Sequence, residues 1–232
     1  NDGVRIAAMS HPDLVRASGK FRLATKIIPD RLQAWRHLGF TLSATGEIDG
    51  AISAFEFVTQ LAQTDTASQR ALGTLYLSRA RYDEAIDLFE RALVHGEQVG
   101  ILTNLAVAQT RHGDLAAAQL TYQRALEADP DHWQSHYNLG SLLWESGHPE
   151  EAIEAFGRAV ELNPNDLEAR YNLAVAYLGT EQLEEALPLL ELLSREMPDN
   201  GPLWRELARV YAHLGMVAQS KSAQARAVVL GQ

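Results

Sequence analysis

Hydrophobic and small residues recur along this chain in one block that repeats about every 34 residues. The clearest copy combines a Leu-Gly pair with later small, aromatic and proline positions: Tyr137, Asn138, Leu139, Gly140, Ala152, Phe156, Ala159 and Pro164. The next copy keeps the same order: Tyr171, Asn172, Leu173, Ala174, Ala186, Leu190, Leu193 and Pro198. A proline just past the second apolar segment indicates a helix end, because a helix cannot continue through it. Each block is therefore predicted to form a pair of helices.

The same phase can be followed through nearly the whole chain. Residues 1–31 match a truncated unit, whose second helix carries Ala17, Phe21 and Ala24 and whose first helix would lie in residues 4–9. Full repeats are predicted at residues 32–65, 66–98, 99–132, 133–166 and 167–200. Residues 201–232 form a final unit with polar Ser220 and Gln224 at core positions, as suits a stack end that meets water. The sequence thus predicts one all-α solenoid of stacked helix pairs over residues 1–232.

These positions resemble the tetratricopeptide repeat family, which places Trp, Leu-Gly and Tyr on a first helix and Ala, Phe and Pro on a second. Trp35, Leu38 and Gly39 begin one such copy, and Trp204 and Leu207 begin another. The resemblance implies a right-handed superhelix of antiparallel helix pairs, whose first helices line a concave groove. It also implies that the groove binds peptides or proteins, since members of the family usually do so. Fold alone does not name the partner.

The residue before the Leu of the Leu-Gly or Leu-Ala pair is Asn in three successive repeats: Asn104, Asn138 and Asn172. If this chain follows the family geometry, these side chains face the groove. An amide offers both donors and an acceptor, so a row of them can bind the backbone of an extended peptide. The pattern resembles the asparagine ladder in the tetratricopeptide superhelix of O-GlcNAc transferase. The alternative is that each Asn bonds to a neighbouring helix.

Aromatic and basic residues occupy adjacent first-helix positions. Tyr137, Trp144 and Tyr171 predict an exposed aromatic cluster in the middle of the groove, which a ligand would cover. Arginines lie toward both ends: Arg36, Arg70, Arg111, Arg205 and Arg209. This lining favours an extended, acidic peptide. The alternative is that Arg and Tyr pack on adjacent repeats through their stems.

Composition excludes several other classes. The formal net charge of −10 argues against nucleic acid, whose phosphates need a basic face, and no apolar run is long enough for membrane insertion. The chain has no cysteine, hence no disulfide or thiolate metal site. His132 and His136 are spaced for one helix face beside two aspartates, but that pattern favours a helix start over a metal site. The sequence predicts no cofactor, no metal and no catalytic constellation, and so no enzyme.

The sequence therefore predicts a protein–protein adaptor that binds an extended polypeptide segment. One alternative is an assembly scaffold that forms homo-oligomers through the stack ends or the convex face. Another is the substrate-binding part of a larger enzyme such as a glycosyltransferase, because the chain begins at Asn1 without Met and is expected to be a fragment. Arginine outnumbers lysine, which fits a GC-rich bacterial genome. A soluble protein of the bacterial cytoplasm or periplasm is expected. The partner, the compartment and the cellular process stay open.

Overall fold

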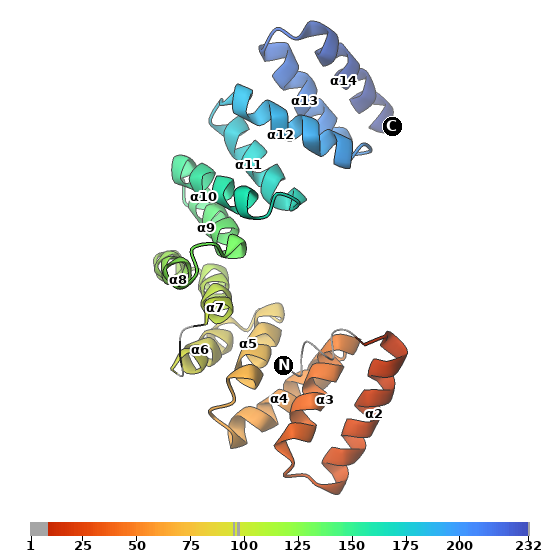
Figure 1. Cartoon of the computed structure of the whole chain (residues 1–232), viewed down its shortest axis with the longest axis vertical. Helices are drawn as coiled ribbons and strands as arrows, with labels where there is room; N and C mark the ends of the chain where they lie inside the picture. Colours follow the sequence, from red (N-terminus) through yellow and green to blue (C-terminus); the bar gives the residue numbers. More distant parts are fainter. Residues whose placement is uncertain (1–8, 95, 97, 232) are drawn as a thin grey trace. The chain divides into compact units, whose positions relative to one another are not determined.

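The computed structural model describes residues 9–94, 96 and 98–231, which form thirteen α-helices and no strand. The all-α class that the repeat predicts is confirmed for this part of the chain. The helices are labelled in Figure 1 and have these bounds: α2 (His11–Ile27), α3 (Leu32–Thr45), α4 (Ile48–Leu61), α5 (Thr66–Ser78), α6 (Tyr82–Leu93), α7 (Val99–His112), α8 (Leu115–Ala128), α9 (Trp133–Glu145), α10 (Pro149–Leu162), α11 (Leu167–Gly179), α12 (Leu183–Glu196), α13 (Gly201–His213) and α14 (Val217–Leu230). The helix expected at residues 4–9 lies outside the described residues, apart from Met9.

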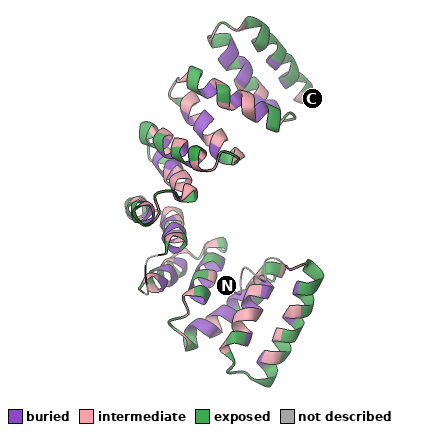
Figure 2. Cartoon of the chain, viewed as in Figure 1, coloured by how far each residue is buried: buried purple, intermediate pink, exposed green. Residues whose placement is uncertain are grey.

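The chain divides into two compact units, Asn1–Ala128 and Asp129–Gln232. In each unit a first helix packs against the second helix that follows it, as α5 does on α6 and α9 on α10. Each second helix also contacts the next first helix of its unit, as α4 does with α5 and α10 with α11. Figure 2 shows how buried and exposed positions alternate along the helices, so that each helix buries one stripe. That these pairs form one domain over residues 1–232 stays a prediction.

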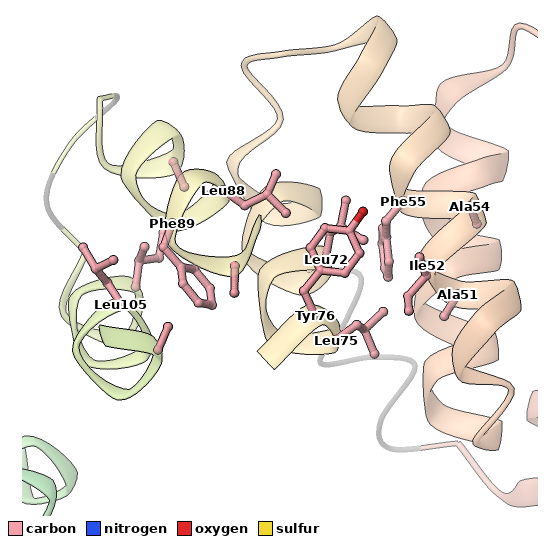
Figure 3. Close-up of a cluster of buried hydrophobic side chains, with 14 of the residues drawn as sticks. Ala51, Ile52, Ala54, Phe55, Leu72, Leu75, Tyr76, Leu88, Phe89 and Leu105 are labelled. Carbon is pink, nitrogen blue, oxygen red and sulfur yellow. The ribbon is translucent and has the colours of Figure 1, made fainter. Parts of the chain in front are cut away.

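A glycine on the first helix allows a phenylalanine of the second helix to approach its backbone. A Cβ atom at Gly39, Gly73 or Gly140 would lie 2.7–2.8 Å from a ring carbon of the phenylalanine sixteen positions later. These rings are Phe55, Phe89 and Phe156, and each is at most 2% exposed. Phe55 and Phe89 belong to the buried cluster of the first unit (Figure 3). The close approach therefore requires glycine, because the three atoms nearest to an added Cβ at Gly140 all belong to Phe156.

Side-chain hydrogen bonds close the turns between repeats. The N-cap residues Asp65, Asp166 and Asn200 each accept a hydrogen bond from the backbone N–H three residues later. At one position of the repeat, a side chain donates to the carbonyl six residues earlier. Trp35 Nε1 and Trp204 Nε1 donate to Pro29 and Pro198 at 2.8 and 2.9 Å. Gln69 Nε2 donates in the same way to Gln63 at 2.8 Å. These bonds fix the starts of α3, α5, α11 and α13, on which several of the predicted site residues lie.

Candidate functional site

The predicted site residues all lie on first helices, but they divide between the two units. The first unit carries Arg36 on α3, Arg70 on α5, and Asn104 and Arg111 on α7. The second carries the remainder: Tyr137, Asn138 and Trp144 on α9, Tyr171 and Asn172 on α11, and Arg205 and Arg209 on α13. Within the second unit the structure brings Tyr137, Trp144 and Asn172 together.

Trp144 and Asn172 line a hollow of about 170 Å³ between α9 and α11. The other lining residues are Ser141 and Glu145 of α9, Phe156 of α10 and Val175 of α11. Phe156 is the same buried ring that packs on Gly140, so it provides a fixed wall. The hollow therefore joins aromatic and aliphatic surface to an amide, a hydroxyl and a carboxylate.

Tyr137 connects neighbouring repeats next to this hollow. Its hydroxyl donates to Glu168 Oε1 at 2.8 Å and accepts a hydrogen bond from Asn172 Nδ2 at 3.0 Å. Its ring centroid lies 5.9 Å from that of Phe156. Burial, followed by the hydrogen bond to Glu168, raises the pKa of Tyr137 to about 12. The expectation of an exposed Tyr137 is thus wrong, because the ring is half-buried and bridges α9 to α11.

Trp144 is also half-buried rather than exposed, and it packs on the hydrophobic core of its unit. A Cβ atom at Gly179 would lie 2.5 Å from Trp144 Cη2, so the edge of the indole rests on the backbone of α11. The indole N–H makes no hydrogen bond within the described part of the chain. Tyr171 alone of the three aromatics is exposed, at 41%.

The three asparagines differ in their bonding. Asn172 donates a hydrogen bond to Tyr137 on a neighbouring first helix. For this residue the structure shows the alternative to a peptide-binding ladder, a bond between helices. Asn104 and Asn138 are half-buried and make no hydrogen bond with other described residues. Two amides at the ladder position are therefore available to another molecule.

Two of the five arginines are held by carboxylates. Arg36 forms an ion pair with Asp65 at 3.4 Å, and Arg209 forms one with Glu206 at 3.4 Å. Arg70, Arg111 and Arg205 are exposed and form no ion pair with the residues that the structure describes. Arg36 is thus bound to the residue that caps α5, and three of the five arginines stay without an ion pair among the described residues.

A larger hollow in the first unit was not predicted from the sequence. It has a volume of about 440 Å³ and lies among α4, α5 and α6. Its lining includes four carboxylates: Glu56, Asp83, Glu84 and Asp87. Each has a partner in the fold. Glu56 accepts from the Tyr76 hydroxyl at 2.7 Å, and Asp83 lies 3.0 Å from His112. Glu84 pairs with Arg81 at 3.0 Å, and Asp87 pairs with Arg91 at 3.3 Å. Each of these carboxylates is thus paired within the first unit.

His132 and His136 also have structural roles. His132 Nδ1 accepts from the Ser135 N–H at 3.3 Å and caps α9, and burial lowers its pKa. His136 Nε2 lies 2.9 Å from the Pro130 carbonyl. The described residues contain no group of three His, Cys, Asp or Glu side chains arranged to hold a metal. None of the described helices is both long and apolar enough to cross a membrane.

Comparison with known families agrees with this architecture. Tetratricopeptide repeat models match residues 70–100, 109–161 and 143–209, which together cover more than half of the chain. The chain therefore belongs to the tetratricopeptide repeat family. The particular resemblance to O-GlcNAc transferase stays a prediction.

Two curated relatives show how far this similarity extends in sequence. The chain is 28% identical over 138 residues to the BBSome complex member BBS4 of Xenopus tropicalis, which covers 59% of this chain and 27% of that protein. It is 26% identical over 130 residues to a CTR9 homolog of Arabidopsis thaliana, which covers 55% of this chain and 12% of that protein. The chain thus matches less than a third of the length of either relative.

Solved structures confirm the fold. YrrB, described as a TPR protein with an unusual peptide-binding site, superposes with a TM-score of 0.60 and 23% identity over 85% of this chain and 98% of its own. MamA gives a TM-score of 0.63 and 22% identity over 69% of this chain and 95% of its own. PilF of Pseudomonas aeruginosa gives a TM-score of 0.71 and 16% identity over 83% of this chain and 88% of its own. At these identities the likeness shows the fold alone.

Proposed function

We propose that this chain is a protein-interaction module that binds an extended polypeptide along its first helices. Tetratricopeptide folds generally mediate protein–protein interaction, and YrrB is described as having a peptide-binding site. The observation that carries the proposal is the state of Asn104 and Asn138. Both amides are half-buried and have no bonding partner among the described residues, although amides in such positions are usually bonded to protein or water. A peptide backbone offers the N–H and C=O groups that would complete them.

Trp144 and Tyr171 add apolar contact area within the second unit, which also carries Asn138. The Trp144 indole N–H lacks a bonding partner among the described residues, and Tyr171 is 41% exposed. Aromatic groups of this kind are enriched at interfaces because they combine a large apolar surface with one polar atom. The proposed role of Tyr137 is different: it holds Asn172 and Glu168 rather than contacting the peptide with its hydroxyl.

The test begins with peptides selected from a displayed random library by the purified chain. Replacing Asn104 and Asn138 together with Ala should weaken the selected peptides about 5-fold to 150-fold, because each lost hydrogen bond is worth about 0.5–1.5 kcal/mol. Asn165→Ala is the matched control, since Asn165 is an exposed turn residue off the first helices. Peptide titration by fluorescence anisotropy measures affinity, and circular dichroism measures folding. Unchanged affinity in the folded double variant would contradict the proposal.

The stack ends support a second candidate, the homo-oligomeric scaffold. Helix α2 exposes Val15, Leu23 and Ile27 at 51–68%, and α14 exposes Val217, Val228 and Val229 at 58–65%. Exposed apolar residues gathered at an end of a repeat stack suit association with another chain. Light scattering would give a mass above that of the 25.6 kDa monomer if this candidate holds. A role as the substrate-binding part of a larger enzyme stays a prediction.

A further inference from the structure

We infer that the hollow between α9 and α11 receives one cationic side chain, arginine or lysine, from the bound polypeptide. This inference rests on the proposed function and names the residue that the second unit selects. The arginine positions suggested an acidic peptide. This hollow instead carries the negative charge of Glu145, so it favours a basic residue of the peptide.

The size of the hollow suits one side chain. Its volume of about 170 Å³ lies below the 300–1,000 Å³ that is usual for a small-molecule pocket. A single long side chain can fill it while the rest of an extended peptide passes over the first helices.

The charge of the lining favours a cation. Glu145 is exposed and forms no ion pair with the described residues, and the lining residues include no Lys, Arg or His. An unpaired carboxylate beside low-dielectric aromatic walls attracts a positive charge more strongly than one in open water. An incoming guanidinium or ammonium group can make a charge-assisted hydrogen bond with it.

The hydrogen-bond network leaves acceptors facing the hollow. The single proton of the Tyr137 hydroxyl is donated to Glu168, so this oxygen can only accept from Asn172. Asn172 must therefore turn its Nδ2 toward Tyr137, which leaves its Oδ1 as a free acceptor. The Ser141 hydroxyl donates to the Tyr137 carbonyl at 3.2 Å, so its oxygen lone pairs also remain. Together with the Glu145 carboxylate, the oxygens of Asn172 and Ser141 give the hollow three acceptors. They suit the several N–H donors of Arg or Lys, whereas a side chain without a donor could not bond to them.

The walls complete the match. Trp144 and Phe156 are held in place, one by the backbone at Gly179 and the other by Gly140. Preformed aromatic surface binds the methylene stem of Arg or Lys and attracts its charge through the ring face. The indole N–H of Trp144 is a donor and suits a carbonyl of the peptide backbone. Tyr137 and Glu168 thus act as positioning residues for Asn172.

The experiment uses capped pentapeptides of the form Ala-Ala-X-Ala-Ala, with Arg, Lys, Gln or Glu at X. Binding is followed through the Trp144 indole N–H resonance, which is assigned with Trp144→Phe. The Arg and Lys probes should shift this resonance and saturate it, and the Gln and Glu probes should not at the same concentration. Equal shifts for the Gln probe would overturn the inference.

Variants at Glu145 provide the second arm. Glu145→Gln should weaken the Arg probe at least about threefold, and Glu145→Lys should transfer the preference to the Glu probe. Glu196→Gln is the matched control, because Glu196 is exposed on α12 and does not line the hollow. If library peptides bind and depend on Asn138 but ignore Glu145, the proposed function stands and this inference falls. If no peptide binds to the folded chain, both fall.

Discussion

The contact between Gly140 and Phe156 gives the sharpest test of how this fold is held together. A Cβ atom added at Gly140 would lie 2.7, 2.9 and 3.0 Å from three ring carbons of Phe156. Ordinary contacts between carbon atoms are about 3.5–4.0 Å, so the ring would have to retreat. Phe156 is 2% exposed and lies in the core of the second unit, where neighbouring side chains oppose such a movement. Gly140→Ala therefore overpacks the core.

The expected cost of this overpacking is about 1–3 kcal/mol. It is opposed by the gain of about 1 kcal/mol that Ala has over Gly inside a helix. Gly157→Ala separates the two effects, because Gly157 lies within α10 and an added Cβ atom there would meet nothing within 4 Å. Gly157→Ala should raise the free energy of unfolding by about 0.5–1 kcal/mol. The difference between the two variants then measures the steric cost alone, about 1–3 kcal/mol.

A compensating change makes the test independent of helix propensity. One repeat later, the equivalent positions hold Ala174 and Leu190, also sixteen residues apart and both buried. Phe156→Leu should therefore rescue Gly140→Ala in part, with a coupling energy of about 1–2 kcal/mol in a double-mutant cycle. Urea and thermal unfolding followed by circular dichroism measure these values, at roughly 2–4 °C per kcal/mol for this chain length. If Gly140→Ala stabilises the chain as much as Gly157→Ala, the assigned close approach is wrong.

Two further predictions concern the turns and the tyrosines. Glu181 has a φ of 61° where other repeats place Gly147 and Gly215, so Glu181→Gly should raise the free energy of unfolding by about 0.5–1 kcal/mol in urea melts. Gly147→Ala, the reverse change at the equivalent position, should lower it, and two shifts of the same sign would refute this account. Burial, then hydrogen bonds to glutamate, raises the pKa of Tyr137 and of Tyr211 to about 12. Because an unfolded tyrosine has a pKa near 10, this contribution to stability is complete below pH ~10 and is lost as the pH rises toward ~12. Thermal melting between pH 8 and pH 11.5 should show the loss, which Tyr211→Phe should reduce, and a constant melting temperature would contradict it.

The helices could be predicted from the sequence because their signals are local and repeated. The Leu-Gly pairs, the Ala-x3-Phe spacing and the prolines occur in one phase several times, so an error in one copy is corrected by the others. Positions 80 and 181 show where this consistency ends, since Ala80 and Glu181 adopt positive φ at a turn that four other repeats fill with glycine. The neighbouring helices impose that turn whatever residue occupies it. A pattern based on glycine therefore underestimates how regular these turns are.

The candidate site could be predicted only in part, because its chemistry depends on contacts between repeats. Spacing placed Tyr137 and Asn172 on first helices, but it could not show that their side chains meet, 35 residues apart, or that Glu168 accepts a hydrogen bond from the tyrosine hydroxyl. These bonds join Tyr137 to α11, and they leave the Oδ1 of Asn172 without a bonding partner among the described residues. In the same way, spacing could not show that Arg36 forms an ion pair with the capping residue of the next repeat. In a repeat protein, a polar residue on a first helix can be satisfied by its neighbour or by a partner. The side chain in the neighbouring repeat therefore decides whether such a residue is available for binding. That neighbouring side chain differs from repeat to repeat, even where the polar residue itself is the same.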